Sequence, residues 1–321
     1  DHFVNAAGGI DIIIGGPPCQ AYSVAGRVRD ENGMKDDYRN YLFEHYLSVV
    51  NRYQPKVFVF ENVPGLLSAM SDGTPIIQLI ESGFSSIGYE IVDDVKKYAK
   101  VDASDYGVPQ NRERLIILGI RKDLCEDVQV ILHRFYLEIL PKYKSKKKKT
   151  VAEAIGDLPK ITPIINDEEL KSRIGYSKPE CHTTWHRARH HSLRDVEIYR
   201  MLANDIQSGR NEYVDSKSLS DLYEEKVGAK SPIHRYHVLR ADEPSTTIIS
   251  HLDRDGNRFI HYDPEQGRDI TPREAARIQS FDDDFDFIGN QTDTYIMIGN
   301  AVPPLLAKCV GLAVSEVLDI L

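Results

Sequence analysis

The stretch IDIIIGGPPCQ, residues 10–20, decides the fold class. Its first half, Ile10–Ile14, is a short run of mostly β-branched apolar residues, which is typical of a buried parallel strand. Two glycines and two prolines end this run in a turn, and Cys19 follows directly. Because ligands in open α/β sheets gather outside the carboxyl ends of strands, the stretch predicts an α/β fold with a thiol at its binding edge.

The first third of the chain continues with alternating helical and strand patterns. Apolar residues at helical spacing predict helices over 41–53 and 76–87, the second followed by a glycine. β-Branched and aromatic runs predict strands over 57–60, 90–97 and 115–120. This alternation predicts a doubly wound α/β sheet.

The regular pattern stops in the middle of the chain and returns near its end. Residues 160–268 are polar and irregular, and contain eight of the eleven histidines and the single tryptophan, Trp185. We expect a smaller inserted domain there, between two parts of one α/β domain at 1–159 and 269–321. The second part is predicted to hold a helix over 271–281 with a capping box at its start, a strand over 295–298 and a closing helix over 301–321.

Composition excludes several classes of protein. The chain has 321 residues, 41% hydrophobic and 28% charged, which is ordinary globular composition. Its net charge of −9 excludes a uniformly basic nucleic-acid binder, although a local basic groove is compatible with it. No apolar run approaches the ~20 residues that span a bilayer. The four cysteines are far apart, so we expect a reducing cytoplasm, with no disulfide framework and no thiolate metal site.

Two further motifs carry polar groups to the ends of predicted strands. Glu61-Asn62-Val63 follows the strand over 57–60, so its carboxylate is expected near Cys19 if the two strands are neighbours. The sequence QNRER, residues 110–114, precedes the strand over 115–120. Two arginines at i and i+2 of an extended segment point the same way and suit a carbonyl or a phosphate ligand.

Together these motifs resemble those of the DNA cytosine-5 methyltransferase family. GPPCQ at 16–20 is similar to the family's nucleophile motif. Residues 61–63 are similar to its ENV motif, and residues 110–114 to its QxRxR motif. The helix at 271–281 and the sequence GNAVPP at 299–304 resemble its later motifs, in the family's order over nearly the whole chain. The resemblance implies a Rossmann-like doubly wound methyltransferase sheet, with an inserted target-recognition domain at 160–268.

The resemblance also implies a reaction, in which cytosine C5 of a specific sequence in duplex DNA is methylated. S-adenosylmethionine would be the methyl donor, without a metal, and the base would be flipped out of the duplex. Cys19 would add to C6 as a thiolate, because C5 becomes nucleophilic only after such addition. Glu61 would bind N3 of the base and Arg114 its O2, with Arg112 supporting the loop or the nucleic-acid backbone.

Further positions follow from the same resemblance. Residues around the donor would be Pro18, Leu42, Asn300 and Val302. Contacts to DNA are expected from a catalytic loop and from the recognition domain: Gln20, Ser23, Arg27, Arg29, Arg187, Arg189, Arg235, Arg240, Thr246 and Thr247. The family's Gly-rich donor-binding segment, of about two βαβ units, is missing before Ile10. We therefore expect an N-terminal segment or a second chain to complete the donor site.

Other interpretations are open at this point. The same family includes a branch that methylates tRNA, and a non-catalytic DNA-binding subunit of a split enzyme would also explain the missing segment. The long insertion at 160–268 favours DNA over tRNA, and the presence of Cys19, Glu61 and Arg114 favours an active enzyme. The spacing of His182, His186 and His190 would align them on a helix, but suitable partner ligands for zinc are not evident. We expect a bacterial, cytoplasmic restriction–modification enzyme.

Overall fold

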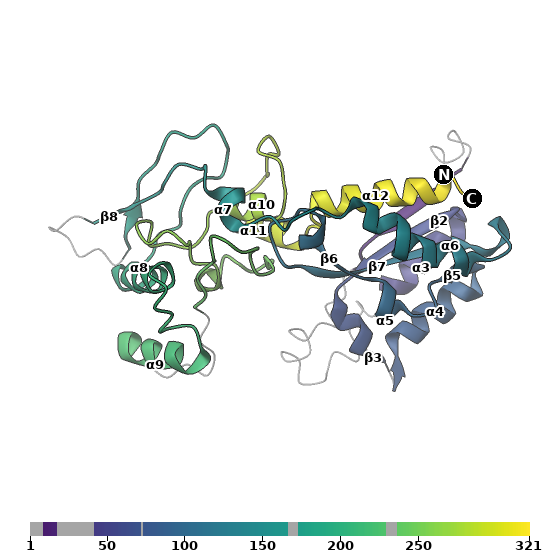
Figure 1. Cartoon of the computed structure of the whole chain (residues 1–321), viewed down its shortest axis with the longest axis horizontal. Coiled ribbons are helices and arrows are strands. Elements are labelled where there is room, and N and C mark those ends of the chain that lie inside the picture. The colour runs from purple at the N-terminus through teal and green to yellow at the C-terminus, as the bar shows by residue number, and fades with distance from the viewer. Residues whose placement is uncertain (1–8, 18–41, 72, 166–172, 229–235) are drawn as a thin grey trace. The chain divides into compact units, whose positions relative to one another are not determined.

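The computed structural model describes residues 9–17, 42–71, 73–165, 173–228 and 236–321 (Figure 1). Within them the chain forms two compact units. The sheet unit contains residues up to 103, then 113–144 and 308–321, and the second unit contains 104–112 and 145–307. The predicted recognition domain at 160–268 is a functional division of the chain, and its boundaries stay a prediction.

A mixed sheet forms the centre of the sheet unit. Its strands are ordered β1-β2-β7-β5, and β6 also pairs with β7. Only β1 and β2 are parallel, because β7 runs antiparallel to each strand that it pairs with. The predicted α/β class is confirmed, with antiparallel pairing at β7. The strands are β1 (Ile12–Gly15), β2 (Val57–Asn62), β5 (Tyr89–Ile91), β6 (Lys100–Asp102) and β7 (Glu113–Arg121).

Aromatic packing aligns the two strands that end at the candidate site. Helices α3 (Leu42–Tyr53) and α4 (Ile76–Ser86) pack on the sheet through a cluster that includes Tyr46 and Phe58. The Tyr46 hydroxyl lies 2.9 Å from the Val59 carbonyl oxygen in β2 and 3.3 Å from the Ile13 carbonyl oxygen in β1. It therefore contacts the backbone of both strands. Because β1 and β2 are parallel and in register, their carboxyl ends meet at one edge.

Tyr136 hydrogen-bonds to the backbone of β7 at residues that lie between its pairings with β5 and β6. Its hydroxyl donates to the Ile116 carbonyl at 2.9 Å and accepts from the Leu118 amide at 3.0 Å. The side chain is buried, which raises the pKa of the phenol. The remaining helices of this unit are α5 (Val95–Tyr98), α6 (Val128–Arg134) and most of α12 (Pro304–Leu318). The predicted strand over 90–97 is thus shorter, since Asp94 caps the start of α5.

The second unit is largely helical and irregular. Its main core contains residues of α7, α10 and α11 together with Phe259 and Ile270. Its elements are α7 (Val151–Ile155), β8 (Pro163–Ile164), β9 (Gly175–Tyr176), α8 (Leu193–Gln207), α9 (Ser216–Val227), α10 (Pro272–Ile278) and α11 (Gln291–Asn300). Short elements elsewhere are η2 (Pro64–Ser68), β3 (Met70–Ser71), β4 (Thr74–Pro75), η3 (Ala103–Tyr106), η4 (Lys122–Leu124), η5 (Phe135–Ile139), η6 (Leu140–Tyr143) and η7 (Gly256–Arg258).

Three local predictions for this unit can be compared with the structure. The capping box at Thr271 and Glu274 is present at the start of α10, as predicted. The predicted strand over 295–298 is wrong, because these residues belong to α11. Residues 193–227 were expected to be irregular and instead form α8 and α9. Within the described ranges, Gln291–Leu318 is long and apolar enough to cross a membrane, and α11 and α12 make up this stretch as two helices.

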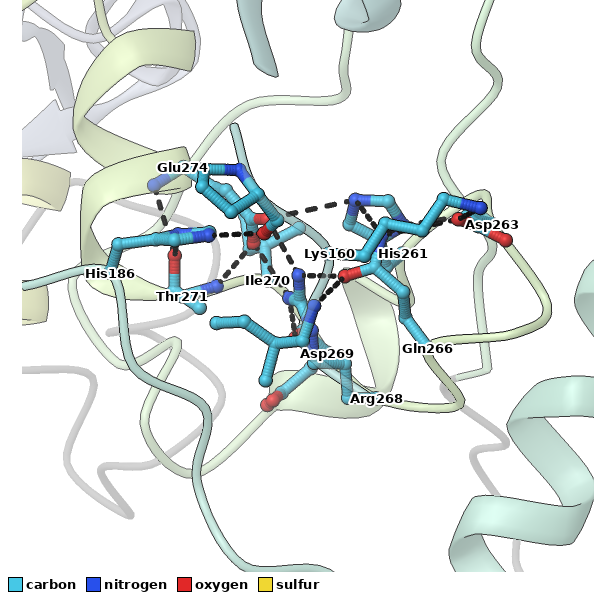
Figure 2. A network of polar contacts seen from close by, with 12 residues as sticks. Lys160, His186, His261, Asp263, Gln266, Arg268, Asp269, Ile270, Thr271 and Glu274 are labelled. Atoms are coloured by element: carbon cyan, nitrogen blue, oxygen red, sulfur yellow. Dashed lines mark hydrogen bonds and ion pairs between the residues drawn. The ribbon is translucent and has the colours of Figure 1, made fainter. Parts of the chain in front are cut away.

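A buried polar network holds α10 in place (Figure 2). Arg268 donates to both carboxylate oxygens of Glu274 at 2.7 Å, and both side chains are almost fully buried. Glu274 also accepts from the Thr271 amide at 2.7 Å. The Asp263 amide donates to Nδ1 of His261 at 3.0 Å, which leaves this buried imidazole neutral. Burying the Arg268–Glu274 ion pair costs desolvation energy, which its good hydrogen-bond geometry offsets. Removing either partner would therefore leave an uncompensated buried charge.

Acid should destabilise the second unit through this network. Burial, together with Arg268, lowers the pKa of His261 from 6.5 to about 3, and Arg268 holds that of Glu274 at about 2 despite burial. The unfolded chain therefore binds more protons than the folded chain below pH 6.5, so stability falls as pH decreases toward 3. Urea unfolding midpoints between pH 7 and pH 4.5 measure this. A His261→Gln variant should flatten the dependence above pH 4.5, and an unchanged slope would contradict the assignment.

Candidate active site

A carboxylate and a guanidinium meet at the edge of the sheet. Glu61 lies near the end of β2 and Arg114 near the start of β7, on paired strands. The Arg114 Nε and a carboxylate oxygen of Glu61 are 3.0 Å apart, and the two side chains are only 12% and 17% exposed. Burial lowers the pKa of the Arg114 guanidinium, while Glu61 opposes that shift. The guanidinium stays charged, since an arginine pKa is far above neutral.

The turn that leads to Cys19 lies against this pair. A Cβ atom placed on Gly16 would be 2.6 Å from Oε2 of Glu61, so the glycine allows the carboxylate to approach the backbone. Asn62 donates from Nδ2 to the Pro17 carbonyl at 3.2 Å, and its Oδ1 accepts from the Val63 amide at 2.8 Å. Asn62 therefore fixes the start of the turn to the strand that bears Glu61. Sequence reasoning gave Asn62 no role, although its place directly after the carboxylate was a usable signal.

Arg112 has a different environment from Arg114. Its side chain is buried in the second unit, where Nη1 donates to the Ile248 carbonyl at 2.8 Å. Nη2 donates to the carbonyls of Gly299 and Ala301 at 2.8 and 3.1 Å. Arg112 and Arg114 therefore have different partners, and the role expected for Arg112, to support the loop or the nucleic-acid backbone, stays a prediction. Because these carbonyls occupy its guanidinium, Arg112 supports the backbone of residues 248 and 299–301, and we treat it as a positioning residue rather than a catalytic one.

Replacing Arg112 with alanine should destabilise the protein by about 3 kcal/mol, because two buried carbonyls and one partly buried carbonyl lose a charged donor. Urea unfolding followed by circular dichroism measures the change. Arg134→Ala is the matched control, since Arg134 is half-exposed and pairs with the exposed Glu138 at i,i+4. It should cost less than about 0.5 kcal/mol. Equal effects of the two substitutions would show that the Arg112 contacts contribute no more than a surface pair.

The structure describes some of the other predicted site residues. Leu42 begins α3 and is half-buried, Asn300 is exposed at the end of α11, and Val302 is half-buried after it. Thr246 is exposed, and the Thr247 hydroxyl donates to the Asn111 carbonyl at 2.7 Å. Seven predicted site residues lie outside the described residues. Six belong to the catalytic turn and loop and one to the recognition region: Pro18, Cys19, Gln20, Ser23, Arg27, Arg29 and Arg235.

The three described recognition arginines differ in what they contact. Arg189 donates to the buried carboxylate of Asp269 and to the Asp253 carbonyl, so it is engaged inside the protein. Its predicted contact with DNA stays a prediction. Arg240 donates to the side chain of Asn211 at 3.3 Å. Arg187 is exposed, and its guanidinium lies over the ring of Trp185.

The histidines around residue 186 do not line one face of a helix, because residues 181–190 are not helical. His186 is buried and contacts the Pro159 carbonyl at 2.8 Å and the Thr271 hydroxyl at 3.2 Å. His190 contacts the Ile174 carbonyl, and His182 is exposed. Among the residues that the structure describes, no group of three metal-ligating side chains is arranged to hold an ion.

The fold and site define an α/β protein in which a carboxylate and a guanidinium meet beside the segment that precedes Cys19. Residues 4–316 match the sequence pattern of the family described as C-5 cytosine-specific DNA methylase, and the chain belongs to that family. It is 35% identical to the type II methyltransferase M.Bpa9945I of Bacillus paralicheniformis, over 97% of this chain and 71% of that protein. It is 33% identical to the type II methyltransferase M1.HphI of Haemophilus parahaemolyticus, over 96% of this chain and 68% of that protein.

Solved structures agree with this membership. A crystal structure of a prophage-encoded E. coli protein, described as a DNA modification methyltransferase, aligns with a TM-score of 0.58 and 26% identity, over 99% of this chain and 82% of that one. A methyltransferase from Entamoeba histolytica shares the fold with a TM-score of 0.52 and 14% identity, over 95% of this chain and 77% of that one. The predicted family and the methyltransferase fold are thereby confirmed.

Proposed function

We propose that this protein transfers a methyl group from S-adenosylmethionine to C5 of cytosine within a specific sequence of duplex DNA, as part of a restriction–modification system in bacterial cytoplasm. The observation that carries the proposal is the Glu61–Arg114 pair, at 3.0 Å and mostly buried, beside the turn that leads to Cys19. A carboxylate and a guanidinium side by side match the N3, exocyclic amine and O2 edge of cytosine.

Three side chains divide the chemistry in this proposal. Cys19 adds to C6 of the flipped base as a thiolate and forms a covalent adduct. Glu61 holds a proton at N3 and accepts from the exocyclic amine, which draws electron density as the adduct forms. Arg114 donates to O2. C5, made nucleophilic by this addition, takes the methyl group. A base then removes the C5 proton, and its electron pair forms the C5–C6 double bond as the Cys19 thiolate leaves C6.

The donor supplies an electrophilic methyl group. Among the positions proposed to surround it, Asn300 fits a ligand contact, because its side chain is exposed directly after the buried Gly299. Leu42 and Val302 are half-buried and would offer apolar contacts. The proposal includes completion of the donor site by residues outside this sequence, from an N-terminal segment or from a second chain.

DNA contacts are proposed for the catalytic loop residues Gln20, Ser23, Arg27 and Arg29 and, in the recognition region, for Arg187 and Thr246. Arg240 and Thr247 are also retained in the proposal, since each is partly exposed and hydrogen-bonded to an uncharged group. Phosphate contacts by such cations would make binding weaken steeply as salt increases.

Bisulfite sequencing of DNA from cells that express the full-length gene tests the proposal, beside cells that carry the empty vector. We expect protected cytosines within one short recurring sequence. Protection in tRNA instead of DNA would show that the protein acts as an RNA methyltransferase. Absence of protection in both nucleic acids, with the protein folded and bound to DNA, would identify a non-catalytic subunit.

A further inference from the structure

Trp185 has a backbone conformation that is unfavourable for a bulky residue. Its φ angle is 66°, in the left-handed region. For a residue with a side chain, such a conformation costs on the order of 1 kcal/mol and persists where the surroundings enforce it. The indole Nε1 donates to the Phe287 carbonyl at 3.1 Å, and the Trp185 carbonyl accepts from the Arg273 amide at 3.2 Å. The indole ring and the backbone of Trp185 are therefore each held by one hydrogen bond.

The support beneath Trp185 is rigid because Arg273 ties it together. Arg273 is fully buried on α10 and donates to the carbonyl and hydroxyl oxygens of Thr184, both at 2.9 Å. It also donates to the carbonyls of Asp282 and Phe285 at 3.0 and 2.9 Å. The segment that bears Trp185 is thus joined to the segment after α10 by four hydrogen bonds from one side chain.

Arg187 is held over the Trp185 ring. Its guanidinium carbon lies 4.7 Å from the ring centroid. Neighbouring side chains point inward: His186 contacts Thr271, and Arg189 contacts Asp269. The Arg187 carbonyl accepts from the Gln291 side chain at 3.4 Å. Its backbone and its stacked side chain are therefore both restrained.

The Arg187 guanidinium keeps its hydrogen-bond donors available. It is exposed, and within the described part of the chain no carboxylate or carbonyl accepts from it. Arg189, two residues later, is engaged by Asp269. An ordinary exposed arginine loses side-chain entropy when it binds, whereas a stacked one has already lost part of it. A cation–π contact uses no N–H group as a hydrogen-bond donor, so the planar fork of N–H groups remains able to bind a ligand.

We propose that Arg187, positioned by Trp185, donates two hydrogen bonds to a pair of acceptor atoms on the target duplex. This inference rests on the proposed function, since it requires DNA as the substrate. The acceptors are either the O6 and N7 atoms of a guanine or two phosphate oxygens, because both pairs match the guanidinium fork. Trp185 is a positioning residue in this arrangement.

Equilibrium binding of the full-length protein to its target duplex, and to duplexes with each base pair changed singly, tests the proposal. Arg187→Ala should raise Kd about 10- to 100-fold, the loss of one bidentate contact. If the acceptor is a guanine, discrimination at one base pair is lost and Arg187→Lys does not restore it. If the acceptors are phosphate oxygens, all duplexes weaken alike, the slope of log Kd against log salt falls by about 1, and Arg187→Lys recovers most of the affinity. Either result supports the contact.

Lys226→Ala is the control for loss of one positive charge, because Lys226 is exposed in the same unit and paired with Glu225. The proposal is overturned if Arg187→Ala has the same Kd, the same discrimination between base pairs and the same salt dependence of Kd as the wild-type protein. Trp185→Leu should raise Kd about 3- to 10-fold, the range expected for loss of a cation–π contact, with folding checked by its unfolding midpoint. If Trp185→Leu binds as wild type does, the positioning role is wrong. Failure of the wild-type protein to bind or methylate any DNA would instead overturn the proposed function.

Discussion

A Cys19→Ser variant should lose methyl transfer by at least about 10⁴-fold, because a serine hydroxyl does not ionise near neutral pH and cannot replace a thiolate that adds to C6. DNA binding should stay close to wild type, since the change removes one sulfur atom at a turn whose start is fixed elsewhere. That start is held by the Asn62 side chain on the Pro17 carbonyl. Incorporation of labelled methyl groups into DNA, measured beside DNA affinity, separates the two effects.

Cys125→Ser is the matched control for this experiment. Cys125 is a half-buried free thiol of the sheet unit, and burial, together with Asp127, raises its pKa. It is therefore less ionised than an ordinary cysteine and should be chemically inert. Equal loss of activity in both variants would indicate damage to the fold. Full activity in Cys19→Ser would exclude the covalent mechanism.

The elements that the sequence predicts well are those whose local pattern and tertiary packing agree. The helix predicted over 271–281 carries a capping box and a proline at its first position, and it forms as α10, which ends earlier, at Ile278. β2 and β7 are apolar runs that become central strands, with most of their side chains buried. Their direction was harder to predict, because an antiparallel and a parallel strand buried on both faces have similar sequences.

Failed predictions have identifiable physical causes. Tyr295–Ile298 was predicted as a strand because four consecutive apolar residues conceal any helical period. In α11, Tyr295 and Ile298 are buried while Ile296 and Met297 are exposed, so half of the apolar run faces outward. A helix start signal was present, since Asn290 and Asp293 form a capping box. The helix α8 was missed although Ser192 caps it and Val196, Tyr199 and Ala203 follow at helical spacing.

The candidate site shows the same division between local and non-local information. The sequence places Glu61 and Arg114 at the ends of two predicted strands, and the structure shows that these strands, β2 and β7, are paired. Spacing says nothing of the environment of Arg112, whose acceptors are residues 248, 299 and 301. Arg187 and Arg189 are likewise equivalent in the sequence. Only a fold that buries Asp269 beside one of them leaves the other available.

Glu61→Gln should lower kcat by about 10²- to 10⁴-fold, the usual contribution of a group that transfers or holds a proton in the transition state. Glutamine has nearly the same shape but cannot hold the N3 proton of the base as a carboxylate does. The neighbouring Arg114 is 12% exposed and would lose its ionic partner. We therefore also expect a moderate destabilisation, of about 1–3 kcal/mol, which urea unfolding would detect.

The split between kcat and affinity distinguishes this role from a structural one. Because Glu61 acts after the base has been flipped, Glu61→Gln should change the Kd for DNA far less than kcat, and single-turnover rates at saturating DNA and donor report the difference. Glu138→Gln is the control, since Glu138 is an exposed carboxylate of the same unit that pairs with Arg134. Its rate should equal that of wild type. If Glu61→Gln matches it, Glu61 serves only as the partner that keeps Arg114 in place, and the proton at N3 must be held by another group.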